Sequence, residues 1–363
     1  MKKAIIIASS VLFFILLACK SNDDETPNSP NSGKQITEFI ISGESAVINE
    51  SAKTITLELS GVDLTSLSPE ITLSAMATVS PVSGAATDFT NPVTYTVIAE
   101  DGTTENYIAT VTSAVQTPTD FISSGLQGPA NMVVIGNDLY IANNNSNYLS
   151  KVDLSLSSPT AESFISGDIG PFDILSDGNT LICSSPPLRK IHRIDIANPV
   201  LETLLTIGQG SFPRGIALDG DFLYVSSTVS NVLEKYDISQ ANPTPTIIAS
   251  GLNNPTDMLL HQNYLYIANF GASTVKRLDI TVPNAPLEDY INNIVSPSSF
   301  AAEGNILYIS DYNSGNIYKK DLSDSSAPQL YAEGLTGPYG LVIHEGKLFI
   351  SEYAANKISK VNH

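Results

Sequence analysis

Three oxygen-bearing side chains recur at a fixed spacing in the C-terminal part of the chain. Asn131, Asp173 and Asp257 each lie two positions after a proline, and successive members are 42 and 84 residues apart. Carboxylate and amide oxygens are the ligands that hard divalent cations prefer. If the three side chains converge, they predict a site for Ca²⁺ or another divalent cation. The alternative is a solvated polar rim with no cofactor.

A second group of residues combines aromatic rings with one positive charge. Phe270, Tyr312 and Tyr353 follow the ends of three corresponding segments, and Arg214 and Tyr339 each directly follow a recurring proline. Exposed aromatic rings bordered by polar groups suit carbohydrate or peptide ligands. We therefore expect a one-sided aromatic platform that binds a ligand. The alternative is that these rings only pack against neighbouring structure.

The pentapeptide LYIAN occurs twice, at Leu139–Asn143 and Leu265–Asn269, and equivalent positions of the two copies are 126 residues apart. Its first four letters match the alternation of a buried strand. The final residues, Asn143 and Asn269, are further candidates for ligand binding.

Other signals of catalysis are weak. The four histidines have no metal-binding spacing, and no serine–histidine–acid set is evident. An aspartate that recurs in the pattern Lys/Arg-x-Asp is predicted to close a turn, because so regular a residue suits a structural acceptor. Its copies are Asp153, Asp195, Asp237, Asp279 and Asp321.

The elements that position these residues follow from an internal repeat. The recurring prolines are separated by 42, 42, 42, 42 and 41 residues, and the second strand of each unit keeps the same spacing. Six units in step are a strong signal of a repeat architecture. The prolines are Pro129, Pro171, Pro213, Pro255, Pro297 and Pro338.

Each unit contains about four short strands with period-two alternation, which is typical of one blade of a β-propeller. Residues 119–363 are therefore predicted to form a six-bladed β-propeller. The sixth unit ends one strand short, at His363. We expect residues 119–123 to supply that strand and close the ring, which would remove the exposed sheet edges.

The repeated pattern Pro-x-(Asp/Asn/Gly), then LYI-(Ala/Ser)-(Asn/Asp), then (Lys/Arg)-x-Asp resembles the NHL-repeat and gluconolactonase-like propellers. That group includes lactonases, lyases and binding platforms. The resemblance implies a divalent metal held by Glu, Asn and Asp from different blades. The chain departs from that pattern because Asn131 replaces an acid in the first blade, and Gly215 and Gly340 carry no side-chain ligand.

An N-terminal unit precedes the repeats. Residues 36–113 contain short alternating strands such as TITLEL, VTYTVIA and NYIATVT. An Asp-Gly turn joins the last two of these, VTYTVIA and NYIATVT, in a hairpin. The pattern predicts a small β-sandwich. The stretch from Thr78 to Thr112 resembles the Ig-like modules of Bacteroidota surface proteins, which implies a spacer or adhesion role. The predicted fold class is thus all-β, an Ig-like β-sandwich followed by a six-bladed β-propeller.

The first residues carry an export signal. Lys2 and Lys3 precede an apolar run that ends at Cys19, and the stretch Leu16–Cys19 resembles the bacterial lipoprotein lipobox. The resemblance implies a signal peptide at residues 1–18, a lipidated Cys19 and a polar tether over residues 19–35. The alternative is a plain signal peptide with an incidental cysteine. We expect a lipid anchor in the bacterial cell envelope, on the outer membrane and facing the cell surface.

The charge and the cysteines limit the partners. The formal net charge is −19, which repels phosphate backbones and argues against nucleic acid as a partner. If Cys19 is lipidated, Cys183 has no partner for a disulfide and is expected in the core.

Two classes of function remain open, together with a third reading. The favoured hypothesis is a non-catalytic, lipid-anchored module that binds a carbohydrate, a peptide or an envelope protein on one face of the propeller. The competing hypothesis is a divalent-metal-dependent lactonase or other hydrolase at the mouth of the pore. The third is a scaffold that only docks envelope proteins.

Overall fold

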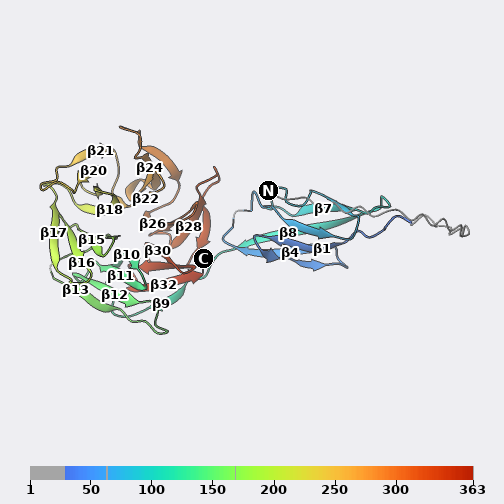
Figure 1. The fold of residues 1–363 in the computed structure, drawn as a ribbon, viewed down its shortest axis with the longest axis horizontal. Coiled ribbons are helices and arrows are strands. Elements are labelled where there is room, and N and C mark those ends of the chain that lie inside the picture. The colour runs from blue at the N-terminus through green and yellow to red at the C-terminus, as the bar shows by residue number, and fades with distance from the viewer. Residues whose placement is uncertain (1–28, 63, 168, 363) are drawn as a thin grey trace, which may run out of the picture. The chain divides into compact units, whose positions relative to one another are not determined.

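The structure is a computed structural model that describes residues 29–62, 64–167 and 169–362 (Figure 1). The predicted signal segment 1–18, Cys19 and the first part of the tether lie outside these residues. None of the helices in the described ranges has the length and apolarity needed to cross a membrane.

The N-terminal residues form two antiparallel sheets. Phe39 and Tyr95, one from each sheet, pack edge to face with ring centroids 5.4 Å apart. The predicted hairpin is present, because β7 pairs with β8 from Val93↔Ala109 to Ile98↔Thr104. One sheet has the order β2 (Glu44–Ser45), β1 (Ile36–Ile41), β5 (Glu70–Leu73), and the other β3 (Val47–Asn49), β4 (Thr54–Ser60), β8 (Thr104–Ala114), β7 (Val93–Ile98), β6 (Thr78–Ser80).

The predicted domain boundary at residue 113 stays a prediction. The chain divides into two compact units, and the second includes Leu57–Leu67, Asp88–Asn91 and all residues from Thr110. The strand β8 runs without interruption from Thr104 to Ala114, so its sequence contains no break that marks the division.

The repeats form six four-stranded antiparallel sheets, and in the first five the strands follow one another in chain order. The sheets are β10 (Pro129–Ile135), β11 (Asp138–Asn143), β12 (Tyr148–Asp153), β13 (Glu162–Ser166); β14 (Ile174–Asp177), β15 (Thr180–Ser185), β16 (Lys190–Asp195), β17 (Leu201–Thr206); β18 (Pro213–Asp219), β19 (Phe222–Ser227), β20 (Val232–Asp237), β21 (Thr246–Ala249); β22 (Pro255–His261), β23 (Tyr264–Asn269), β24 (Thr274–Asp279), β25 (Glu288–Asn292); β26 (Pro297–Glu303), β27 (Ile306–Asp311), β28 (Asn316–Asp321), β29 (Gln329–Ala332); and β30 (Pro338–His344), β31 (Lys347–Glu352), β32 (Lys357–Asn362), β9 (Thr119–Ile122).

The six sheets close into a ring. Each first strand of a unit contacts the first strand of the next, and β30 contacts β10, which completes the circle. The outer strand of the sixth sheet is β9, whose Ile122 lies opposite Ile358 of β32. The all-β fold class, a β-sandwich followed by a six-bladed β-propeller, is confirmed.

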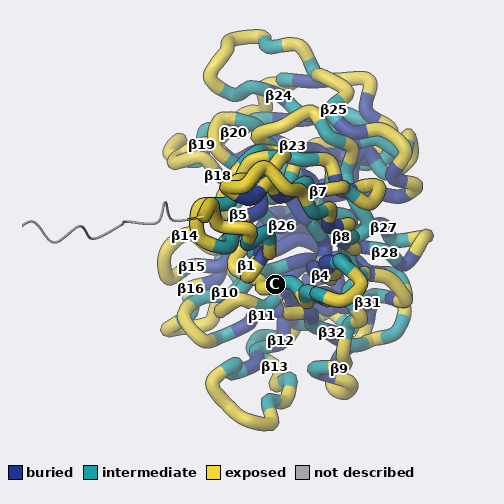
Figure 2. Tube along the Cα trace, turned by 90° about the vertical axis from the view of Figure 1, so that its right-hand side faces the viewer, coloured by how far each residue is buried: buried dark blue, intermediate teal, exposed yellow. Residues whose placement is uncertain are grey.

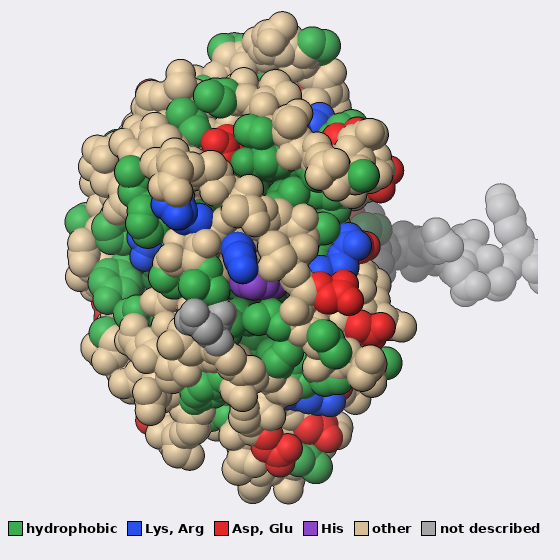
Figure 3. Space-filling view, turned by 90° about the vertical axis from the view of Figure 1, so that its left-hand side faces the viewer, with side chains coloured by type: hydrophobic (Ala, Val, Ile, Leu, Met, Phe, Trp, Pro, Cys, Tyr) green, Lys and Arg blue, Asp and Glu red, His purple; other side chains and the backbone are tan. Residues whose placement is uncertain are grey.

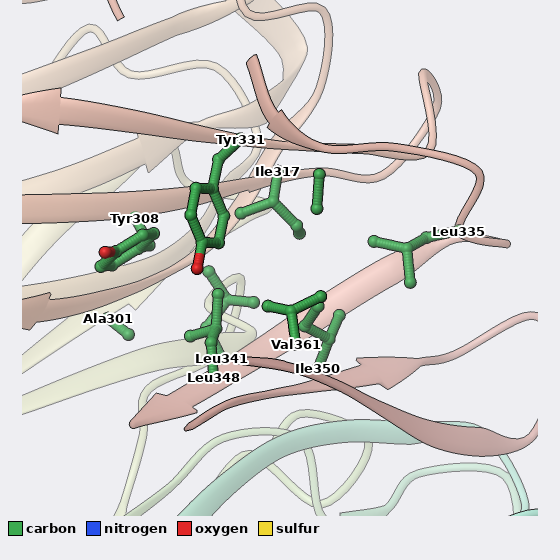
Figure 4. Packing of buried hydrophobic residues seen from close by; sticks show 10 residues of the cluster. Ala301, Tyr308, Ile317, Tyr331, Leu335, Leu341, Leu348, Ile350 and Val361 are labelled. Carbon is green, nitrogen blue, oxygen red and sulfur yellow. The ribbon is translucent and has the colours of Figure 1, made fainter. Parts of the chain in front are cut away.

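Apolar residues of the second strand in each unit fill the spaces between neighbouring sheets. Figure 4 shows the cluster between the fifth and sixth sheets, where Tyr308 and Tyr331 pack edge to face above Leu348 and Ile350. Burying such side chains contributes roughly 1.5–3 kcal/mol each. The burial drawn in Figure 2 follows this pattern, since the buried segments lie along the strands and the exposed ones at the connecting loops.

The third strand of five of the units ends in the predicted Lys/Arg-x-Asp pattern, and both of its charged residues have a structural role. In each copy the carboxylate accepts a hydrogen bond from the backbone N–H two residues later, as Asp153 does from Ser155 at 2.9 Å. The predicted turn-closing role is confirmed. The basic residue lies over an aromatic ring in several blades, as Lys235 does 3.8 Å from the centroid of Phe222.

The surface is mixed in character on the side drawn in Figure 3. Hydrophobic side chains there lie interspersed among polar ones, and charged groups of both signs are scattered.

Candidate functional site

The five residues predicted to form an aromatic platform line one pocket of about 230 Å³. Arg214 and Tyr339 come from the starts of β18 and β30, directly after their prolines. Phe270 opens a short 3₁₀ turn (Phe270–Ala272) after β23, while Tyr312 and Tyr353 directly follow β27 and β31. The repeat places all five at the same end of the propeller, because strands that occupy equivalent positions begin and end on the same face.

The rings of the pocket contact one another edge to face or at a tilt. The Tyr312 ring contacts the other three rings. Its centroid lies 6.2 Å from that of Phe270 and 6.3 Å from those of Tyr339 and Tyr353. Tyr339 is buried, whereas the other three rings are half-exposed. The half-exposed rings present apolar faces to a ligand, and the buried ring forms the floor.

Arg214 is held by a ring that the sequence analysis did not select. Its guanidinium carbon lies 4.0 Å from the centroid of Phe172, and the Phe172 ring packs edge to face on Tyr339 at 5.1 Å. A cation over an aromatic face gains roughly 0.5–2 kcal/mol. Phe172 directly follows Pro171, in register with Arg214 and Tyr339, so the same alignment would have identified it.

The positive charge of Arg214 affects the pKa of two tyrosines in the pocket, Tyr353 and Tyr339. Burial raises the pKa of Tyr353, Tyr312 raises it further, and Arg214 opposes the rise. Burial also raises the pKa of Tyr339, and again the positive charge of Arg214 acts against it. Both hydroxyls therefore remain neutral at physiological pH. The Tyr353 hydroxyl donates to Asn144 or Asn145, which lie 3.0 and 2.9 Å away.

The predicted metal ligands also converge, at the centre of the ring. The amide nitrogen of Asn131 lies 2.5 Å from Asp173 and 3.4 Å from Asp257, and all three side chains are buried. A β-bulge positions Asn131 and Asp257, because the pairing of the first and second strands shifts between Pro129 and Met132 and between Pro255 and Met258. Asp173 lies directly before β14. Bulges of this kind redirect a side chain toward a site.

The two carboxyl groups share one environment. Burial raises the pKa of Asp173 well above its usual range, and the charge of Asp257 adds to the effect. Burial raises the pKa of Asp257 to about 6, although Ser299 and the backbone N–H groups of Met258 and Phe300 oppose the rise. The pair therefore retains a proton near neutral pH, as two adjacent carboxyls in a dry site do.

In their observed orientation, the side chains of Asn131, Asp173 and Asp257 do not present a set of oxygen ligands to a cation. The oxygen of Asn131 accepts a hydrogen bond from the backbone N–H of Met132, so its NH₂ group faces the acids. The oxygens of Asp173 accept backbone N–H groups of Ile174 and Ile216. Among the described residues, no three histidine, cysteine or acidic side chains gather as a metal site. Two proton-sharing carboxyls beside N–H donors fit a divalent cation poorly.

The acid pair lies at the edge of a second cavity, of about 390 Å³, along the axis of the ring. The first strands of all six sheets line it, and beyond the acids its walls are largely apolar, with Met132, Met258 and Phe300 among them.

The structure corrects the prediction for Asn143 and Asn269. Both are buried, with 0% and 1% of their surfaces exposed. Asn143 accepts a hydrogen bond from the N–H of Gln127 and donates to Ser150, and Asn269 accepts one from the N–H of Asn253. Their amides fix the loop that precedes each blade, so they do not face a ligand. Asp311 and Glu352 hold equivalent loops.

The fourth letter of the repeated pentapeptide has a role that the sequence analysis missed. Where it is serine, its hydroxyl accepts a hydrogen bond from the N–H two residues after the repeated proline, as Ser184 does from Asp173 and Ser351 from Gly340. The alternation of alanine and serine at this position was the available signal.

Comparisons with known proteins match the two parts of the chain separately. Residues 36–111 match the family model described as "SGBP, N-terminal", the N-terminal region of surface glycan-binding proteins. That match covers less than half of the chain, so it describes this region only. A search of curated protein sequences finds no match.

Solved structures resemble the chain in fold. A nidogen/laminin complex is 17% identical and covers 68% of this chain and 93% of its own, with a TM-score of 0.54. A luciferin-regenerating enzyme is 11% identical, covering 68% and 95%, with a TM-score of 0.55. A streptogramin B lyase is 13% identical, covering 68% and 97%, with a TM-score of 0.51. At these identities the likeness shows the β-propeller fold alone.

Proposed function

We propose that the protein binds glycans at the cell surface through the aromatic pocket of its propeller. The observation that carries this proposal is the gathering of Arg214, Phe270, Tyr312, Tyr339 and Tyr353 around one pocket. Sugar rings present apolar C–H faces that stack on aromatic side chains, while their hydroxyls bond to polar groups at the edges. The resemblance of residues 36–111 to surface glycan-binding proteins supports the same role.

The pocket's size sets the scale of the ligand. About 230 Å³ is below the ~300–1,000 Å³ typical of sites for drug-sized molecules, so it accepts one sugar unit of a longer chain. The rest of the glycan would extend over the half-exposed rings.

Binding to a panel of soluble polysaccharides, measured by calorimetry, tests the proposal. Alanine at Phe270, Tyr312 or Tyr353 should each weaken binding roughly 10-fold, because each removes a stacking face worth about 1 kcal/mol or more. Alanine at Phe222, an exposed ring in the third sheet that does not line the pocket, is the matched control. Unchanged binding in all three pocket variants would refute the site. Absence of glycan binding would favour the scaffold hypothesis.

We further propose that Cys19 carries a lipid anchor that holds the protein in the bacterial outer membrane, facing outward. Several acyl chains at about 0.8 kcal/mol per buried CH₂ make a stable anchor. Cys19→Ser should move the protein from the membrane fraction to the soluble fraction. An unchanged distribution would contradict the anchor.

A metal-dependent lactonase or hydrolase of the gluconolactonase-like group is the second candidate. The convergence of Asn131, Asp173 and Asp257 favours it, whereas the N–H donors around the two carboxyls argue against a cation. Metal analysis of the purified protein and melting with and without a chelator separate the two candidates. Copurification of a stoichiometric divalent ion, with a lower melting temperature after chelation, would support the enzyme.

A further inference from the structure

The pocket contains one positive charge that the protein itself does not neutralise. Arg214 takes part in none of the ion pairs found among residues 29–62, 64–167 and 169–362. Its guanidinium lies over the ring of Phe172, a contact that holds the side chain in place without occupying its N–H donors. An oriented guanidinium with free donors is prepared for an anion.

The surroundings make this charge unusual. The chain has 37 acidic residues against 18 basic ones, yet none of the pocket's five lining residues is acidic. The acids that act electrostatically on the pocket's floor residue Tyr339 are Asp173 and Asp257. These two are buried and hydrogen-bonded to Asn131 and to backbone N–H groups. A ligand in the pocket therefore meets a cation with which no carboxylate of the described residues forms an ion pair.

A ligand that satisfies both features has an apolar face and an anionic group on the same ring. The aromatic rings take the face, and the planar fork of Arg214 matches two oxygens of a carboxylate or a sulfate. Neutral sugars would leave the guanidinium without an anionic partner in a partly desolvated site, which costs affinity.

We propose that the pocket selects acidic glycans, in which a sugar unit carries a carboxylate or a sulfate that pairs with Arg214. This inference rests on the proposed glycan-binding function and names the class of glycan. Uronic acids and sulfated sugars supply the same chemistry, so the experiment treats them as separate arms.

The test measures binding of the mature protein to polygalacturonate, to the same polymer after methyl esterification, to a sulfated galactan and to a neutral xylan. Wild type should bind one acidic polymer at least 10-fold more tightly than the neutral ones. If the anion is a carboxylate, esterification should abolish that preference. If it is a sulfate, the sulfated galactan should bind best. Because the contact is ionic, binding should weaken as salt is raised.

Variants identify the residue responsible. Arg214→Gln should lose at least 10-fold in affinity for the acidic polymer, so that the acidic polymer binds no more tightly than the neutral ones. Arg214→Lys keeps the charge without the fork, so it should retain an intermediate affinity. Arg189→Gln is the control, because Arg189 hydrogen-bonds to exposed Gln209 and does not line the pocket. Circular dichroism melting of each variant verifies that the propeller remains folded.

Two different results would overturn the inference, and they are distinguishable. If neutral glycans bind as tightly as acidic ones and Arg214→Gln has no effect, the acidic preference is wrong and the glycan function stands. If neither acidic nor neutral glycans bind, both the function and its specificity fail.

Discussion

At the scale of single residues, the buried titratable groups set how stability depends on pH. His192 lies in β16 with 2% of its surface exposed. Burial lowers its pKa, and the neighbouring Lys190 lowers it further. The unfolded chain, with an ordinary histidine pKa of about 6.5, therefore takes up this proton at a higher pH than the folded chain.

His192→Leu should consequently flatten part of the pH profile. As pH falls from 7.5 through 6.5, wild type loses the stability that comes from keeping His192 neutral, and the variant does not. The difference in melting temperature, variant minus wild type, should rise on acidification. Melting followed between pH 7.5 and 5.5 measures it, with His344→Leu at a half-exposed site as the control. A constant difference across this range would contradict the assignment.

The acid pair Asp173 and Asp257 changes the stability in the opposite direction, because its pKa values are raised and not lowered. A folded-state pKa raised to about 6 for Asp257 stabilises the fold below the unfolded value of 3.8, and this contribution is lost as pH rises through 6.

Asp257→Asn keeps the shape and removes the charge. We expect it to raise the stability by about 2 kcal/mol at pH 7.5 and by much less at pH 4.5. Denaturant unfolding at the two pH values tests this. If Asp257→Asn changes the free energy of unfolding equally at pH 7.5 and 4.5, the charge of Asp257 does not destabilise the fold at the higher pH.

How much of the site the sequence predicts depends on what each residue does. The five pocket residues could be predicted from the sequence because the repeat defines their place in every blade. Phe172 was missed although it lies in register with Arg214. Asn143 and Asn269 were misassigned because a strand-terminal amide faces a pore or a loop according to backbone geometry, which spacing alone does not specify.

At the scale of elements, the approach of the first strands toward the axis determines which side chains fit there. A Cβ atom at Gly340 would lie 2.5 Å from the carbonyl oxygen of Ala130 and 2.7 Å from the Cα of Asn131. A Cβ atom at Gly215 would likewise lie 2.7 Å from the Cα of Asp257. The glycines that leave gaps in the ring of candidate ligands are therefore required by close strand contact.

Gly340→Ala should destabilise the protein by about 1–3 kcal/mol, because backbone atoms have to move to admit the methyl group. Thermal or denaturant unfolding measures the loss. Gly208→Ala is the control, since nothing lies within 4 Å of its Cβ position and its backbone is not left-handed. If the two variants are equally stable, the strands are not packed as closely as described.

The strands themselves were predictable from alternation and turn residues, whereas the bulges were not. A bulge at the start of the first strand arises from the meeting of neighbouring blades at the axis, and that is a tertiary constraint. The adjacent strand does not mark it, because two units with a bulge have alanine there, Ala142 and Ala268, and others have a serine such as Ser226, which accepts the N–H of Gly215.

At the scale of the whole molecule, the stability of the propeller depends on its closing strand. Ile122 of β9 is 3% exposed and packs in the cluster that includes Met132, Leu139 and Ile358. It thus joins the first and last blades.

Ile122→Ala should cost about 2–4 kcal/mol, from lost burial and from the cavity that remains. Because one ring contains all six sheets, we expect the loss to lower the whole propeller transition and not to melt one blade separately. Far-ultraviolet circular dichroism and tyrosine fluorescence should report the same midpoint. Ile247→Ala in the outer strand β21, where the side chain is 62% exposed, should change stability by less than about 0.5 kcal/mol.

The pairing of the first and last strands of the propeller in one sheet also limits how such a molecule can change its size in evolution. Thr119–Ile122 and Lys357–Asn362 are committed to each other, so a duplicated unit appended at either end would find no open edge. A seventh blade can arise only by insertion of a whole period within the chain, which shifts every later blade around the circle. A period inserted between Arg214 and Tyr339 would place the two residues farther apart around the ring, and the pocket would be lost even if each blade still folded. Selection for the pocket is thereby also selection against an added blade in that part of the chain.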